Sequence, residues 1–280
     1  ASSSCAISPS CSTRLAAASR WRASVRIAVL LKQVPDIVEE LEVAPDGKDL
    51  ARDDLTYRLN EFDDYALEEA LQLKAAGAAE VIALALDGGE VDNLLYTALA
   101  KGADRAIKVT GAPEDARDPR AAALMLAAAL RPLAADLVLT GVQAPDDLEG
   151  QTPPLVGAAL GLPHVNVVTG IELSGSAVTV TQEFSGGLVA TLRGDLPVVL
   201  GVQSSREPPR YAAITRVRAA MAAGKLETVA VDVPASAPRV ELRRLYKPES
   251  TSHAEMIPGG TDEAAATLAA ILRERGFGGQ

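Results

Sequence analysis

The residues with the clearest potential for chemistry lie together in the segment Gly141–Thr152, which follows an apolar run and precedes a helical pattern. Thr152 is suited to the N-cap of that helix and Pro153 to its first position, since proline lacks an N–H that would be unpaired there. The free amides of such a first turn, with Gly150, Gln151 and the Thr152 hydroxyl, could cradle a phosphate group. The segment therefore predicts a nucleotide-binding turn, and an ordinary polar strand–helix connection is the alternative.

Three acidic residues of the same segment, Asp146, Asp147 and Glu149, would stand near a bound anion. Carboxylates can hold ribose hydroxyls or brace a backbone turn while the amides face the phosphate, so they are compatible with such a site. The chain has no Walker A sequence, and no glycine-rich dinucleotide fingerprint follows its first expected strand. P-loop and dinucleotide sites are therefore unsupported.

Metal-binding and hydrolytic sites find no support in the other reactive residue types. The two histidines, His164 and His253, are far apart and have no cysteine or paired carboxylate at ligand spacing. Both cysteines, Cys5 and Cys11, lie in the first eleven residues, which argues against a structural disulfide. No combination of serine, histidine and acid suggests a triad. We therefore predict neither a metal site nor a catalytic residue.

The elements that must position the nucleotide turn alternate along the chain. Short β-branched runs alternate with amphipathic helical patterns from Val25 onward, which is typical of βα units around a parallel sheet. Asn60 can cap the first helix, and Gly102 can end the second. The expected strands are Val25–Leu31, Val81–Leu86, Ala106–Val109 and Asp136–Thr140, and the other expected helices are Glu90–Lys101 and Ala121–Leu130.

The pattern changes after residue 160. A strand is expected to start at His164, and Val178–Thr181 and Leu188–Leu192 resemble the arms of an antiparallel hairpin, followed by a strand over Pro197–Val202. We therefore predict an α/β fold with an open, mostly parallel, doubly wound sheet and an antiparallel hairpin addition.

The last part of the chain, from about Leu226, shows no strong period until Thr261, which is expected to be the N-cap of a helix. Leu268, Ile271 and Leu272 would give that helix one apolar stripe. We interpret residues 226–280 as a C-terminal arm that packs on a partner subunit, with packing on its own domain as the alternative. The nucleotide-binding domain is then expected over residues 25–225.

Composition limits the possible partners. The chain has 280 residues and a formal net charge of −10, which disfavours nucleic acid, and its apolar runs are too short for membrane insertion. Residues 1–24 contain eight serines, three arginines and no acid. We expect this extension to be disordered. It is either a transit peptide or a translated stretch upstream of a start at Val25.

Several separated motifs resemble the beta subunit of electron transfer flavoproteins, the FixA-like family. They occur in one order and cover nearly all of the chain from Val25 onward. The segments that carry the resemblance are Arg26–Asp36, Leu59–Lys74, Lys101–Arg105, Gly141–Thr152, Phe184–Leu192, Leu196–Pro197 and Glu207–Tyr211.

This resemblance implies an electron-carrier subunit, not an enzyme, with an adenine-nucleotide hydrolase-like fold. It implies a heterodimer with an alpha subunit that holds most of the FAD, while the beta subunit buries AMP. Electrons would pass from acyl-CoA or related dehydrogenases to a quinone-linked oxidoreductase. The implied location is the bacterial cytoplasm, with the mitochondrial matrix as the alternative.

The family's AMP contacts can be carried over to positions of this chain. They fall on Leu30, Asn60, Glu61, Phe62, Asp63, Leu86, Gly141, Val142, Gln143, Ala144, Pro145, Asp146, Asp147, Leu148, Glu149, Gly150, Gln151 and Thr152. Phe62 and Ile37 fall where the family places side chains near the flavin, and Ile37 replaces a frequent tyrosine.

The family's dehydrogenase-docking loop falls around Arg210–Ala220. Ile214 takes the place of its anchoring aliphatic side chain, and Arg216 and Arg218 remain from a cluster that is usually lysine-rich.

Pro153 and Pro154 stand where relatives usually carry glycine. They remove amide donors, which puts the phosphate geometry in doubt.

Two other functions stay open. Some relatives bind a second FAD at the AMP position and bifurcate electrons. A stand-alone ATP-binding module of the universal-stress type is the other alternative.

Overall fold

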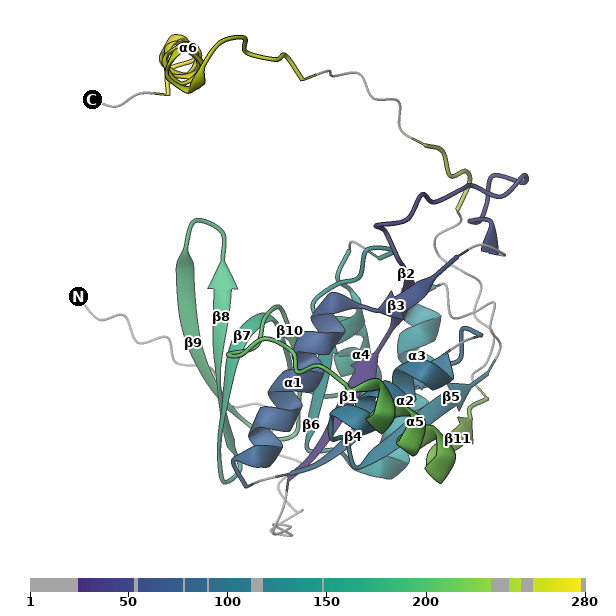
Figure 1. The fold of residues 1–280 in the computed structure, drawn as a ribbon. Coiled ribbons are helices and arrows are strands. Elements are labelled where there is room, and N and C mark those ends of the chain that lie inside the picture. The colour runs from purple at the N-terminus through teal and green to yellow at the C-terminus, as the bar shows by residue number, and fades with distance from the viewer. Residues whose placement is uncertain are drawn as a thin grey trace, which may run out of the picture. The chain divides into compact units, whose positions relative to one another are not determined.

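The structure is a computed structural model that describes residues 25–52, 55–77, 79–89, 91–111, 118–147, 149–232, 242–247 and 254–277 (Figure 1). It divides the chain into two compact units. The first unit is Ala1–Glu42 with Ala51–Glu241, and the second is Val43–Leu50 with Leu242–Gln280. The predicted extension over residues 1–24 and His253 lie outside the described residues.

The first unit is built around one nine-stranded sheet with the order β11-β5-β4-β1-β6-β10-β7-β8-β9. The pairs from β11 to β7 are all parallel, and the pairs of β8 with β7 and β9 are antiparallel. The strands are β1 (Val25–Leu31), β4 (Ala79–Leu86), β5 (Arg105–Thr110), β6 (Leu137–Gly141), β7 (His164–Ser174), β8 (Ala177–Phe184), β9 (Leu188–Asp195), β10 (Val198–Val202) and β11 (Leu226–Ala230). The predicted open, mostly parallel sheet with a hairpin addition is confirmed.

Helices cover both faces of this sheet, and a small second sheet lies in the connection after β1. That sheet pairs β2 (Gln33–Pro35) with β3 (Tyr57–Leu59) in antiparallel fashion. The helices of the first unit are α1 (Glu61–Ala75), α2 (Val91–Lys101), α3 (Pro119–Leu130) with the 3₁₀ turn Arg131–Leu133, α4 (Thr152–Leu160) and α5 (Ile214–Ala223). The predicted βαβαβαβ order of the first half is confirmed.

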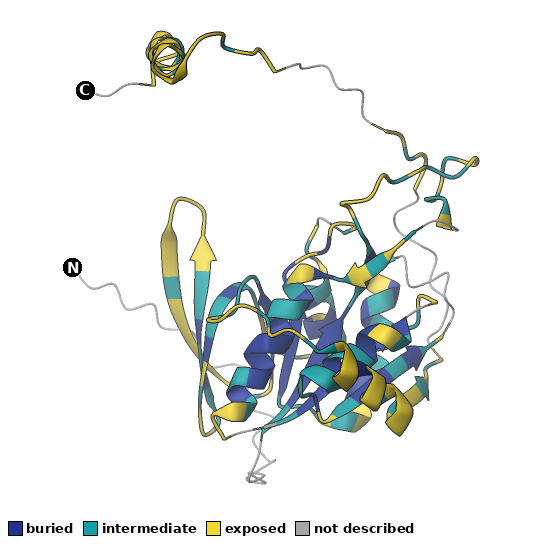
Figure 2. Cartoon of the chain, in the orientation of Figure 1, coloured by how far each residue is buried: buried dark blue, intermediate teal, exposed yellow. Residues whose placement is uncertain are grey.

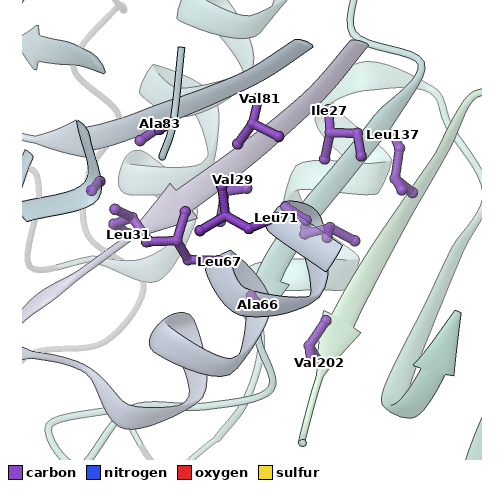
Figure 3. Packing of buried hydrophobic residues seen from close by; sticks show 14 of the residues in the cluster. Ile27, Val29, Leu31, Ala66, Leu67, Leu71, Val81, Ala83, Leu137 and Val202 are labelled. Atoms are coloured by element: carbon purple, nitrogen blue, oxygen red, sulfur yellow. The ribbon is translucent and has the colours of Figure 1, made fainter. Parts of the chain in front are cut away.

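The core explains why β1 is apolar at each position from Ile27 to Leu31. Ile27, Val29 and Leu31 belong to the hydrophobic cluster beneath α1 and α2. Ala28 and Leu30 belong to the cluster beneath α3 and α4. Figure 3 shows the first cluster, where the β1 side chains meet residues of α1. A strand buried on both faces needs apolar residues at every position, which is typical of parallel sheets in doubly wound folds.

Two elements differ from the predictions, and a third begins at the predicted residue, His164. The segment expected as a docking loop is partly helical, since α5 begins at Ile214. The last strand, β11, pairs with β5 in the main sheet, so this sheet extends beyond residue 225. The strand expected to start at His164 is eleven residues long and forms the base of the hairpin.

Figure 2 shows that much of β9 and the tip of the hairpin that it forms with β8 are exposed. Several of the exposed residues there are apolar. Val178 and Val180 are buried in the core. Further along the same face, Phe184 pairs with Leu188, and both side chains are about half exposed or more, at 49% and 68%. One face of the hairpin therefore carries apolar residues beyond the core, interrupted on β8 by Gln182, and this hairpin stripe ends in the exposed Phe184 and Leu188.

The second unit contains a short loop, an extended segment and one helix. Leu245 N–H donates to the Gly47 carbonyl at 2.7 Å, and the Arg244 guanidinium lies 5.5 Å from the centre of the Tyr246 ring. The helix α6 (Thr261–Glu274) begins one residue earlier than a Thr261 cap would place it, since Gly260 is the N-cap. None of its residues is buried, and Leu268 and Leu272 are exposed.

Over the described ranges, no helix combines the length and the apolar character needed to span a bilayer. The same residues contain no group of three or more potential metal ligands.

Candidate nucleotide site

The sheet order places a topological switch point, where this fold class has its crevice, between the ends of β1 and β6. The chain leaves β1 toward β4 on one side of the sheet, and β6 lies on its other side. Connections diverge at such a topological switch point, and the carboxyl ends of the two strands then frame a ligand-binding crevice. Lys32 follows β1 and Val142 follows β6. The sequence-predicted nucleotide turn therefore lies at the position where this fold class binds ligands.

Asp63 joins the two strand ends across this switch point. One carboxylate oxygen accepts from the Lys32 N–H at 2.8 Å, and the other accepts from the Gly141 N–H at 2.7 Å. The residue is buried, with 4% of its surface exposed. A side chain in the first turn of α1 thus satisfies one partly buried and one buried backbone donor, and it holds the ends of β1 and β6 together.

The Asp63 carboxyl is unusually hard to ionise. Burial raises its pKa from 3.8 to about 7, even though the amides of Gly141 and Lys32 favour the charged form. A carboxyl whose pKa is raised by folding stabilises the protein most below pH 3.8, and this contribution is lost as the pH rises through 7.

We therefore expect the stability difference between wild type and Asp63→Asn to depend on pH. Wild type should lose up to about 4 kcal/mol of unfolding free energy between pH 4 and 7 relative to the variant, because asparagine does not ionise. Denaturant unfolding at a series of pH values measures this difference. A constant difference across that range would contradict the raised pKa.

Asn60 is the N-cap of α1 but does not cap it with its side chain. Its Nδ2 instead donates to the Gln143 carbonyl at 2.9 Å and so holds the turn after β6. Its Oδ1 is buried and meets no hydrogen-bond donor among the described residues. An unpaired buried acceptor is costly, so this oxygen suits a ligand that brings a donor.

The turn after β6 is compact near its tip. The backbones of Ala144 and Asp147 exchange two hydrogen bonds, of 3.1 and 3.0 Å, which close a tight turn. Lys32 Nζ reaches across the crevice to Asp146 at 2.8 Å, and both side chains are partly exposed. Lys32 was not predicted as a site residue, although it is the first residue after β1.

The second half of the turn presents backbone donors. Within the described part of the chain, no acceptor meets the amides of Gly150, Gln151 and Thr152. These residues immediately precede or begin α4, where the helix dipole favours an anion. The prediction that Thr152 caps α4 is wrong by one position, because Thr152 is already helical and Gln151 is the N-cap, without a side-chain cap bond.

Other predicted contacts line the same edge of the sheet. Leu30 is the penultimate residue of β1 and Leu86 is the last residue of β4, the neighbouring strand. Glu61 and Phe62 begin α1, the former exposed and the latter half-buried. The structure thus brings the predicted residues from three strands and one helix together, and Leu148 lies outside the described residues.

A family comparison decides what kind of protein carries this crevice. The electron transfer flavoprotein domain matches residues 48–236. The chain belongs to the electron transfer flavoprotein beta subunit family. Relatives with that name occur in Methylophilus methylotrophus, 32% identical over 89% of this chain and 98% of the relative, and in Syntrophomonas wolfei, 34% identical over 89% and 96%. The human subunit is 35% identical over 70% of this chain and 77% of its own length.

The predicted docking residues of this electron transfer flavoprotein chain lie apart from the crevice, on α5. Ile214 is the first residue of that helix and is 59% exposed, and Arg216 and Arg218 are exposed as well. The segment before α5 is held by Glu68, which accepts three hydrogen bonds from Arg210 at 2.8 to 3.0 Å. This ion pair lowers the pKa of Glu68, although burial opposes the effect.

The donor and acceptor groups of the crevice fit an adenylate. Three amides at a helix start that meet no acceptor among the described residues match the acceptor oxygens of a phosphate. The Asn60 oxygen matches an amine or hydroxyl donor of a nucleoside. The residues that would hold the phosphate therefore differ from those that would hold the nucleoside.

Proposed function

We propose that this electron transfer flavoprotein chain is one half of a heterodimer, that it binds AMP as a structural ligand, and that it helps to hold the FAD of an alpha subunit. The heterodimer passes electrons from acyl-CoA or related dehydrogenases to a quinone-linked acceptor. FAD supplies the redox chemistry when bound, and this chain supplies binding surfaces without catalytic residues of its own. The proposed location is the bacterial cytoplasm.

The observation that carries the AMP proposal is the crevice that Asp63 braces between β1 and β6. Its two strand ends are tied to α1 through the Lys32 and Gly141 amides, and beside it stand the amides of Gly150–Thr152, which no described residue accepts. Backbone donors at a helix start bind a phosphate without a basic side chain. This fits a chain that has no P-loop lysine.

The alpha-subunit proposal is supported by uncovered apolar surface. Phe184 and Leu188 continue the core face of the hairpin into solvent, and Ile37 in the connection after β2 is 61% exposed. Exposed apolar residues that cluster on one element are typical of protein interfaces. We place the alpha subunit on the hairpin stripe, and Ile37 and Phe62 toward its flavin. The arm with α6 would also pack on that subunit.

The dehydrogenase proposal is supported by α5. Ile214 offers an exposed aliphatic anchor at a helix start, and Arg216 and Arg218 add positive charge in an acidic chain. Such charges raise association rates with acidic partners more than they raise affinity.

Co-expression with an alpha-type subunit tests the heterodimer. The expected product is a yellow complex with one copy of each chain, measured by absorbance and native mass spectrometry. A colourless chain that stays alone, or that forms a homodimer, would contradict the proposal.

Replacing Thr152 with valine tests the phosphate site. This change keeps the shape of the side chain and removes its hydroxyl, which we expect to weaken AMP binding by about 1.5 to 3 kcal/mol, the cost of one hydrogen bond to a charged group. Equilibrium dialysis of the heterodimer against labelled AMP measures the effect. Unchanged affinity would remove Thr152 from the site.

A further inference from the structure

The strand β7 contains a strained break at the point nearest the nucleotide turn. Its pairing with β10 shifts register between Leu200 and Val202, and its pairing with β8 shifts between Val168 and Gly170. Val167 lies within the first of these irregularities, between Val165 and Val168, and adopts a φ of 61°. A β-branched residue is a rare outlier in this left-handed region, and such strain persists where the surrounding structure enforces it, often at functional sites.

The break directs Asn166 beneath the turn. Its Nδ2 donates to the Gly150 carbonyl at 3.4 Å. The carbonyl of Asn166 is not left unpaired, since Gln182 Nε2 donates to it at 2.9 Å from β8. A side chain of β8 therefore bonds the backbone carbonyl at the irregular point of β7, which holds this part of the strand in place.

Two glycines make room for this arrangement. A Cβ on Gly201 of β10 would lie 1.9 Å from Asn166 Oδ1 and 2.7 Å from Pro153 Cγ. A Cβ on Gly150 would lie 2.8 Å from the Val142 carbonyl, and Gly150 has a φ of 61°. Asn166 thus fills the space between β10 and the start of α4, with its Oδ1 buried and lacking a donor among the described residues.

We propose that Asn166, set in place by the break at Val167, is a positioning residue for the nucleotide. By holding the Gly150 carbonyl it turns the following amides, of Gln151 and Thr152, toward the phosphate. The inference rests on the proposed AMP site. None of the predicted nucleotide contacts lies on β7. The role of this strand would be to shape the turn that binds the phosphate.

The test measures the turn itself as well as the ligand. Hydrogen exchange of the amides of Leu155, Val156 and Gly157 is followed in the heterodimer after AMP removal, because Leu155 N–H donates to the Gln151 carbonyl at 3.0 Å and so reports on the turn. AMP retention is measured separately. Asn166→Asp keeps the shape and removes the donor, and Asn166→Ala removes both. Each variant should exchange about fivefold faster over this stretch, as expected for one lost hydrogen bond, and should lose AMP faster at unchanged FAD content.

Three further variants keep the outcome decisive. Gly201→Ala should reproduce the effect, because it displaces Asn166, whereas Val167→Gly should retain the turn, since glycine adopts the same φ freely. Asn93→Ala, on the exposed side of α2, is the matched control and should change nothing. Unchanged exchange in both Asn166 variants would overturn the inference. Faster exchange with no AMP in wild type would refute both the AMP proposal and the role of Asn166 toward the nucleotide, and would leave only its structural role in shaping the turn.

Discussion

Gly141→Ala is expected to destabilise the protein by about 2 to 4 kcal/mol and to release the bound nucleotide. The new Cβ would lie 2.5 Å from Asp63 Oδ1 and 2.8 Å from the Asp63 amide nitrogen. It would therefore push α1 away from β6 and break a buried hydrogen bond as well as overpack the core. Denaturant unfolding measures the stability, and analysis of the purified heterodimer measures the AMP content.

Gly170→Ala is the control for this prediction. Gly170 also lies in a strand of the sheet, but a Cβ there would meet its nearest neighbour, Thr181, at an ordinary 3.6 Å. We expect this variant to stay within about 1 kcal/mol of wild type. Equal effects of the two substitutions would show that the approach of α1 to β6 is not what Gly141 provides.

Asp63→Ala is expected to cost about 2 to 5 kcal/mol at neutral pH. The substitution leaves the amides of Lys32 and Gly141 buried without their acceptor, and each such loss costs about 1 to 3 kcal/mol. The same loss unties β1 from β6, so the affinity for AMP should fall as well. Denaturant unfolding and dialysis against labelled AMP provide the two measurements.

Asp92→Ala separates this effect from the loss of a surface carboxylate. Asp92 also lies in the first turn of a helix, but it is half exposed and pairs with Lys108. Exposed ion pairs contribute about 0 to 1 kcal/mol. If Asp63→Ala were no more harmful than Asp92→Ala, the bridge across the switch point would have no role in stability.

The first half of the fold could be predicted because its local signals agree with its packing. The strand at Val25–Leu31 is apolar at each position, as burial on both faces requires, except for Arg26. Gly102 ends α2 with a φ of 127°, as predicted from its residue type. Periodicity, turn residues and the final environment indicate the same structure, so the sequence alone is sufficient there.

Other elements could not be predicted because their environment is set by distant residues. The break at Val167 changes which side chains of β7 face each side of the sheet. The alternation of apolar and polar residues that marks a strand is therefore lost in its sequence. β11 is an edge strand whose residues are partly exposed, so its apolar pattern is weak.

The candidate site also combines local signals, which the sequence shows, with long-range contacts, which it does not show. The nucleotide turn was predicted from its glycine, proline and threonine residues, which act locally. Asp63 bonds to two residues that are 31 and 78 positions away in the sequence. Asn166 bonds to Gly150, which is 16 positions earlier. Such contacts depend on which strands become neighbours, and the resemblance supplied Asp63 as a contact without its bridging role.

The most direct test of the account is the identity of the nucleotide in the crevice. The purified heterodimer is denatured, and the released small molecules are identified and quantified by mass spectrometry. We predict one AMP and one FAD per heterodimer. Two FAD molecules would instead indicate electron bifurcation, ATP without flavin would indicate a stand-alone ATP-binding module, and the absence of any adenine nucleotide would contradict the central claim that the braced crevice binds an adenylate.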